Sequence, residues 1–398
     1  MTSKPNSLVS LRELQSSDLW RWSEKLLSFD TVSHKSNKEC ADFFANELEV
    51  FGFDVQILKE PNNKYQVVAH CGPPEKDGLI LSGHMDIVPF DTQEGWTTDA
   101  LKLTLKDDKL YARGSSDMKL FMAHCLQAFK ELDLKKLKKP VVCLFTCDEE
   151  IGCLGAKSMA PRLKSLLGKM PLPKKAVIGE PTHFKIINSH KGMVIFEVIL
   201  KGKAAHSSRP DWGINAILPA EKVIAATRRL NEQYLDVQDE SLKKLFPDFP
   251  FNYLSLVRIK GGIADNVIPD ECRLVFSYRP LPGADLMGAF EDLKKELKDL
   301  QGEISFRHLV SAPGVAPADN PELIEVLKSV TREKELHAVS FTTDASFFST
   351  QDIDCFICGA GNIEIAHQPN EFMSLSDFLQ GPVFVKNLVS RSLMDTSA

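Results

Sequence analysis

The residues best suited to chemistry are histidines and carboxylates that stand beside short apolar runs. His84 and Asp86 come directly after the run 79–83, and alternate side chains of an extended strand share a face. A histidine that binds metal through one nitrogen needs its other N–H held, commonly by a carboxylate, and Asp86 is spaced for that role. Taken alone, His-x-Asp is as easily explained by two unrelated polar residues at the end of a strand.

Carboxylates follow two further elements of the chain. Asp117 opens an expected helix over 118–132, where capping the helix is the alternative role for an aspartate. The apolar strand 141–146 runs into Asp148, Glu149 and Glu150. Three adjacent carboxylates repel one another unless cations neutralise them, although a solvated acidic loop is the alternative interpretation.

The same pattern recurs twice more, and the sum of the sites carries the inference. Glu180 ends the strand 176–179, and His367 follows the strand 354–358. Ligand sites in α/β sheets form at the carboxyl ends of strands, so we expect these side chains to gather there. Two imidazoles and several carboxylates suit a pair of hydrolytic divalent metals, with zinc the natural choice for nitrogen and oxygen ligands. One carboxylate must then stay off the metals as the base that takes a proton from water.

The elements that must position these residues predict two domains. Over the first 185 residues, buried strands alternate with amphipathic helices, which predicts an α/β domain with helices on a mostly parallel sheet. From about Gly192 the order becomes β-α-β-β-α, which is typical of an α+β split-βαβ module. Its expected elements are a strand at 194–200, a helix at 213–231 with Pro219 in its first turn, strands at 252–259 and 272–278, and a helix at 286–300. We therefore expect a discontinuous domain, 1–187 and 301–398, interrupted by an inserted domain at 188–300.

Composition excludes several classes of protein. The 398 residues carry 48 basic and 54 acidic side chains, for a formal net charge of −6. Such a balance provides no broad cationic face, so neither nucleic acid nor a membrane surface is an expected partner. The N-terminus lacks the apolar region of a signal peptide, and the nine cysteines form no disulfide framework, which favours a reducing cytoplasm. Cys355 and Cys358 lie inside an apolar strand and are expected in the core.

At the residues described above, the sequence resembles the M20 family of di-zinc aminoacylase-type peptidases over essentially the whole chain. The resemblance implies an α/β/α catalytic domain, a ferredoxin-like lid domain that also dimerises, and two Zn²⁺ per subunit with Co²⁺ or Mn²⁺ as substitutes. It implies the following roles: His84 and Glu180 on one metal, Glu150 and His367 on the other, Asp117 bridging both, Asp86 orienting His84, and Glu149 as the general base.

The resemblance also assigns residues in the lid domain. His206, in Ala-Ala-His-Ser-Ser, matches the histidine that reaches the partner subunit's site and donates to the scissile carbonyl oxygen. Asn266 and Arg279 match a pair that grips the substrate, and the fork of an arginine suits the carboxylate of an amino acid. Without the motif, Asn266 would be read as a turn residue and Arg279 as a surface charge.

Four stretches, 148–156, 179–182, 278–283 and 366–371, are most similar to the acetylornithine deacetylase subgroup of the family. That similarity implies hydrolysis of N2-acetyl-L-ornithine to L-ornithine and acetate in arginine biosynthesis, and the dimerising lid of the family implies a homodimer. The motifs do not encode the shape of the substrate pocket. Succinyl-diaminopimelate desuccinylase, broad aminoacylase and dipeptidase activities therefore stay open, as does a catalytically silent homologue.

Overall fold

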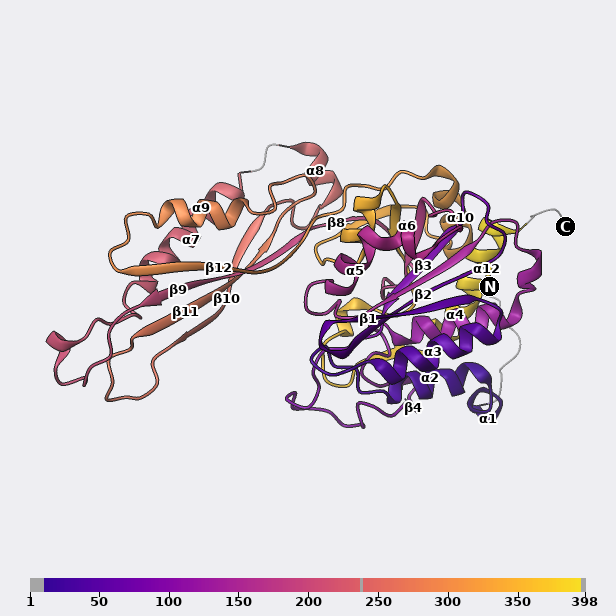
Figure 1. Cartoon of the computed structure of the whole chain (residues 1–398), viewed down its shortest axis with the longest axis horizontal. Coiled ribbons are helices and arrows are strands. Elements are labelled where there is room, and N and C mark those ends of the chain that lie inside the picture. Colours follow the sequence, from indigo (N-terminus) through magenta and orange to yellow (C-terminus); the bar gives the residue numbers. More distant parts are fainter. Residues whose placement is uncertain (1–10, 237–238, 395–398) are drawn as a thin grey trace, which may run out of the picture. The chain divides into compact units, whose positions relative to one another are not determined.

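The computed structural model of the chain describes residues 11–236 and 239–394, which divide into two compact units (Figure 1). The first unit runs to Ile187 and resumes over Ala318–Leu336 and from Phe347 onward. The second unit comprises Asn188–Pro317 and His337–Ser346. Because the chain leaves the first unit and later returns to it, the second unit is an insertion in the first.

Six strands of an eight-stranded sheet with the order β1-β2-β6-β3-β7-β14-β8-β13 lie wholly in the first unit, whereas β8 and β13 run into residues of the second. The strands are β1 (Asp54–Glu60), β2 (Lys64–Cys71), β3 (Leu79–His84), β6 (Val141–Thr146), β7 (Lys175–Ile178), β8 (Ile186–His190), β13 (Leu336–Val339) and β14 (Asp354–Ile357). The central run β6-β3-β7-β14 is parallel, and β3, β6 and β7 are buried along their whole length. Strands buried on both faces require the continuous apolar runs that the sequence has there.

Helices cover this sheet and a small second sheet adjoins it. The helices are α1 (Leu11–Gln15), α2 (Asp18–Ser28), α3 (Lys38–Val50), α4 (Lys119–Glu131), α5 (Leu154–Met159), α6 (Leu163–Leu166), α10 (Pro321–Thr331), α11 (Ala345–Phe348) and α12 (Leu375–Leu393). α3 packs on β1 and β2, α4 packs on β3, and α2 and α12 pack against α4; α2, α3 and α4 lie together on one side of the sheet in Figure 1. The small sheet has the order β15-β5-β4, from β15 (Phe372–Ser374), β5 (Lys109–Tyr111) and β4 (Thr104–Lys106).

The second unit is an antiparallel sheet with helices on one face. Its strands are β9 (Met193–Lys201), β10 (Tyr253–Gly261), β11 (Glu271–Arg279) and β12 (Glu303–Ala312), in the order β10-β11-β9-β12, and its helices include α7 (Ala220–Tyr234), α8 (Glu240–Leu245) and α9 (Gly288–Glu296). Alternate residues of β9 point into its core, where Phe196 stacks on Phe276 and meets the edge of Phe290 from α9, both at 5.2 Å between ring centroids. The predicted fold class, mixed α/β with a mostly parallel sheet and a separate antiparallel sheet, is confirmed.

Two boundaries differ from the sequence-based expectation. The inserted unit does not end at residue 300, because β12 pairs with β9 from Glu303↔Lys201 to Ala312↔Met193 and so completes the antiparallel sheet. The helix expected from residue 213 begins only at Ala220. Ile214 instead exchanges two backbone hydrogen bonds with Lys203, which keeps the chain extended before the helix.

No helix of the described part of the chain is long and apolar enough to cross a membrane. All nine cysteines lie among the described residues and are free thiols. Cys355 and Cys358 are fully buried in and just after β14, as expected of core residues.

Candidate metal centre

The parallel strands of the first unit deliver three of the predicted residues to one edge of the sheet. His84 is the last residue of β3, Glu150 lies in the loop after β6, and Glu180 lies two residues after β7. β3 is aligned with both neighbours, since His84 is opposite Thr146 of β6 and residue 82 is opposite residue 178 of β7. The carboxyl ends of the three strands therefore coincide, and so do the side chains that follow them.

Close packing shapes the main chain beside the site. A side chain at Gly179 would place its Cβ 2.2 Å from the Phe121 ring of α4, so only glycine fits immediately before Glu180. Asp117 lies two residues before α4, and its side chain is buried. His367 follows β14 with φ +62°, in the left-handed region of backbone space.

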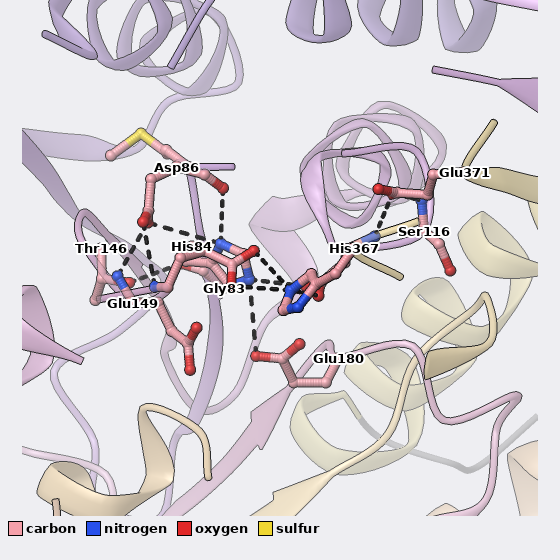
Figure 2. A network of polar contacts seen from close by, with 12 residues as sticks. Gly83, His84, Asp86, Ser116, Thr146, Glu149, Glu180, His367 and Glu371 are labelled. Carbon is pink, nitrogen blue, oxygen red and sulfur yellow. Dashed lines mark hydrogen bonds and ion pairs between the residues drawn. The ribbon is translucent and has the colours of Figure 1, made fainter. Parts of the chain in front are cut away.

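Two groups of potential metal ligands share Asp117. His84, Asp117 and Glu180 form one group, and Asp117, Glu150 and His367 form the other; within each, the ligand atoms all lie within 4.8 Å of one another. Asp117 Oδ1 lies 2.9 Å from His84 Nε2, and Asp117 Oδ2 lies 3.2 Å from His367 Nε2. Each oxygen of one carboxylate thus faces a different histidine, and Figure 2 shows the two histidines and Glu180 converging. This arrangement fits two cations bridged by Asp117.

The contacts of His84 settle which of its nitrogens is available. Nδ1 lies 2.9 Å from the main-chain carbonyl oxygen of Asp86, which can only accept, so Nδ1 carries the proton and donates it. Nε2 therefore faces Asp117 and, at 4.0 Å, Glu180. Burial lowers the pKa of His84, but the hydrogen bond with Asp117 and the charge of Glu180 outweigh it and hold the pKa well above its usual value. The surroundings of Nε2 favour a positive charge at this position.

The second group favours positive charge in the same way. Hydrogen bonds with Asp117 and Glu150 raise the pKa of His367 to about 11. Burial and the charge of Asp117 raise the pKa of Glu150 to about 7, against the opposing contact with His367. The pKa of Asp117 lies well below its usual range although burial alone would raise it, because both histidines contact it. Mutually repelling buried carboxylates held around two imidazole nitrogens make a donor set suited to divalent metals.

Glu149 belongs to neither of these two groups. It is partly buried, and Figure 2 shows its side chain beside His84 and Glu180. The thiol of Cys153 donates to its Oε1 at 3.4 Å. A carboxylate beside the ligands but outside them can take and return a proton.

Asp86 holds this acidic loop through its side chain. Its buried carboxylate accepts the N–H groups of Glu149 and Glu150 at 3.0 and 3.2 Å and the hydroxyl of Ser33 at 2.7 Å. The carboxylate lies 3.7 Å from His84 Nδ1, so the closer contact to His84 comes from the carbonyl of Asp86 rather than from the side chain expected there.

The neighbouring residue of the loop is fixed by a separate ion pair. Asp148, at φ +57°, pairs with the buried ammonium group of Lys64 at 2.8 Å. Lys64 also donates to the main-chain oxygen of Ser33, the residue whose hydroxyl contacts Asp86. One buried cation therefore holds both Ser33 and the acidic loop.

The predicted lid residues all lie in the second unit. His206 and Asn266 are exposed and on adjacent segments, since His206 forms a bridge with Val267 and the N–H of residue 207 donates to the Asn266 carbonyl at 2.9 Å. His206 Nδ1 lies 2.7 Å from the Ser208 hydroxyl. Arg279 ends β11, whereas Asn266 precedes the start of that strand, so the two expected substrate contacts stand at opposite ends of β11.

Two residues at the centre had no role in the sequence-based prediction. Glu371 is buried and accepts the N–H groups of Ser116 and Asp117, and Arg113 pairs with it at 2.7 Å. Glu371 stands in the same motif as His367, but a sequence does not distinguish a carboxylate that binds main-chain N–H groups from one that binds metal.

Comparison with known proteins agrees with this geometry. Residues 80–391 match the model of the family described as peptidase family M20/M25/M40. An acetylornithine deacetylase from Pasteurella multocida is 36% identical over 360 residues, covering 88% of this chain and 90% of the relative. One from Myxococcus xanthus is 33% identical over 367 residues, covering 89% and 92%. The crystal structure of the M20 family metallo-carboxypeptidase Sso-CP2 from Sulfolobus solfataricus superposes with a TM-score of 0.77 at 20% identity, covering 95% of this chain and 99% of that one. The chain therefore belongs to peptidase family M20/M25/M40.

Proposed function

We propose that the chain is a zinc-dependent amidohydrolase that converts N2-acetyl-L-ornithine and water to L-ornithine and acetate, as a step of arginine biosynthesis in the cytoplasm. The observation that carries the proposal is the Asp117 carboxylate, with one oxygen toward each histidine of a five-ligand set. The similarity to acetylornithine deacetylases over most of the chain supports the choice of substrate. The free thiols support a reducing compartment.

His84, Asp117 and Glu180 would hold one zinc ion, and Asp117, Glu150 and His367 the other. When bound, such a pair lowers the pKa of water and polarises the scissile carbonyl. The protein's own contribution is the prearranged donor set: the Nδ1–H of His84 is committed to a carbonyl, which leaves Nε2 for the metal.

Glu149 is assigned the proton transfers. A carbon–oxygen bond forms between water and the acetyl carbon while the amide carbon–nitrogen bond breaks. Glu149 accepts the proton that water gives up and later delivers a proton to the departing amine of ornithine. The hydrogen bonds that the N–H groups of residues 149 and 150 donate to the Asp86 carboxylate support this role, because they fix the loop that carries the base.

The lid residues require a second subunit in this scheme. β11 has nine residues, which at about 3.4 Å each span roughly 27 Å, so His206 and Asn266 at one end cannot serve the same small substrate as Arg279 at the other. We assign Arg279 to the carboxylate of the substrate. His206 and Asn266 are assigned to the site of the partner subunit, where His206 donates to the carbonyl oxygen as negative charge develops.

An apolar surface of the second unit supports the homodimer. Leu218 and Ile263 are 71% and 86% exposed, and Val257 and Ile259 on β10 are also exposed. These segments adjoin one another, since the Ile217 side chain packs against the end of β10 at residue 261. Exposed apolar side chains gathered in this way mark an interaction surface.

A panel of acylated amino acids tests the proposed substrate. The purified protein is assayed for release of acetate or amine with and without a metal chelator. We expect N2-acetyl-L-ornithine to be hydrolysed fastest and the chelator to abolish the reaction. Equal rates on N-acetyl-L-methionine would indicate a broad aminoacylase, and preference for N-succinyl-diaminopimelate or a dipeptide would indicate those activities. Absence of turnover by the zinc-loaded protein on every substrate would overturn the proposal.

A further inference from the structure

A buried arginine–glutamate pair lies beside the ligand groups and belongs to neither. Arg113 and Glu371 are each 1% exposed, and Arg113 Nη1 donates to Glu371 Oε2 at 2.7 Å. Apolar residues of similar volume often stabilise a core as well as a buried ion pair does, so stability alone does not account for this one. The other contacts of the two side chains show what the pair connects.

Glu371 holds the main chain at the bridging ligand. Its Oε1 accepts the N–H of Ser116 at 2.8 Å and the N–H of Asp117 at 3.0 Å (Figure 2). Because Oε2 is occupied by Arg113, both oxygens of Glu371 are engaged with the protein. Two successive N–H groups on one oxygen fix the peptide before Asp117, and so fix the direction in which its carboxylate points.

Arg113 extends the same network to the loop that carries His367. Its Nη2 donates to the side-chain oxygen of Gln93, and Gln93 Nε2 donates to the main-chain oxygen of His367 at 2.9 Å. His367 adopts φ +62°, a conformation that a non-glycine residue needs support to keep. Asn370 of the same loop accepts the N–H of Thr97 at 2.7 Å, a second contact to the segment that carries Gln93.

We propose that Arg113 and Glu371 are positioning residues of the metal centre, which set Asp117 directly and His367 through Gln93. The inference rests on the proposed metal-dependent function, because the side chains positioned are the ones that would hold the metals. It follows that a substitution at Glu371 and a substitution at Gln93 should affect the binding of the two metals differently. Glu371 acts on Asp117, which both ligand groups share, whereas Gln93 acts on His367, which belongs to only one.

Stepwise zinc affinities test this asymmetry. Metal-free Glu371→Gln, Gln93→Ala and wild-type proteins are titrated with Zn²⁺ in competition with a chromogenic chelator, and far-UV circular dichroism confirms that each is folded. Glu371→Gln should weaken both binding steps by about 10- to 100-fold, the range typical of residues that orient ligands. Gln93→Ala should weaken one step and leave the other unchanged. Excess zinc should restore most of the turnover number of both variants.

A matched control is Glu60→Gln. Glu60 also accepts from an arginine, Arg162, and from Ser158 at 2.8 Å, but it contacts no residue of either ligand group. Its zinc affinities should equal those of the wild type. A folded Glu371→Gln protein with wild-type affinities would overturn the proposal, and so would an equal change of both steps in Gln93→Ala.

The outcomes also separate this inference from the proposed function. If Glu371→Gln fails to fold, Gln93→Ala still decides the matter, because Gln93 is only half-buried and its loss of one binding step is the specific expectation. Failure of the wild type itself to bind two zinc ions would contradict the proposed function. An active wild type with two zinc ions and unaltered variants would contradict only the positioning role.

Discussion

The substitution Asp86→Asn tests how the acidic loop is held in place. The Asp86 carboxylate is fully buried and accepts three hydrogen bonds, from the N–H groups of Glu149 and Glu150 and from the hydroxyl of Ser33. The contact to His84 uses the main-chain carbonyl of Asp86, so it survives a change of side chain. The substitution therefore perturbs the loop while leaving the tautomer of His84 in place.

The structure sets the size of the expected effect. With its oxygen at the Oδ2 position, asparagine still accepts from Glu150 and Ser33 but presents an amide, which only donates, to the N–H of Glu149. Hydrogen bonds to a charged group contribute about 1.5–3 kcal/mol each, so losing one bond and the charge that strengthens the other two should lower the free energy of unfolding by about 2–4 kcal/mol. Ser33→Ala removes only the hydroxyl bond, recorded at 2.7 Å, and should lower it by about half as much.

Urea unfolding of the metal-free proteins measures these differences, with tryptophan fluorescence to follow the first unit, which contains Trp20 and Trp22 in its core. Asp86→Asn should also lower the turnover number, because Glu149, the proposed base, loses one of the hydrogen bonds that hold its main chain. An Asp86→Asn protein as stable as Ser33→Ala, with wild-type turnover, would refute the idea that this carboxylate holds the loop.

Three further predictions follow from other parts of the molecule. Glu149→Ala should retain both zinc ions by elemental analysis but lose about 10²- to 10⁴-fold in turnover, since Glu149 belongs to neither of the two groups that would hold the metals; loss of zinc would make it a ligand instead. His124 of α4 is neutral when folded, because burial lowers its pKa from 6.5 to about 3; its contribution to stability is complete above about pH 6.5 and is lost as the pH falls toward 3. The urea midpoint of unfolding of His124→Leu should accordingly fall less between pH 7 and pH 4 than that of the wild type. An equal fall of the midpoint in both proteins would contradict this. If the chain forms the proposed homodimer, Leu218→Asp combined with Ile263→Asp should convert it to a monomer in sedimentation velocity, and a dimer that persists in this variant would place the interface elsewhere.

The sequence predicts those parts of the fold that are buried on every side. Strands β3, β6 and β7 lie within a residue or so of their expected positions, because a strand covered on both faces needs an uninterrupted apolar run. β12 was not expected, since it is an edge strand in which exposed and half-buried residues alternate and charged side chains interrupt the apolar pattern. Only its pairing with β9 shows that it belongs to the inserted unit.

Some residues of the candidate site could likewise be predicted from the sequence, and others could not. His84 and Glu180 could be predicted because they stand at or just beyond the carboxyl ends of buried strands, and the structure places them in one group with Asp117. The role of Glu371 could not, because it consists of contacts with Arg113 and Asp117, more than 250 positions away along the chain. Contacts of that kind arise from the folded arrangement of loops, and no local pattern of residues encodes them.

A zinc titration of chelator-stripped protein tests the two-metal centre most directly, with bound zinc per subunit and acetate release from N2-acetyl-L-ornithine measured on the same samples. If Asp117 bridges two zinc ions, we expect no hydrolysis by the stripped protein, a rate that reaches its plateau at two zinc ions per subunit, and loss of both binding and hydrolysis in Asp117→Asn. Hydrolysis by metal-free protein, or two zinc ions bound as tightly by Asp117→Asn as by the wild type, would contradict it.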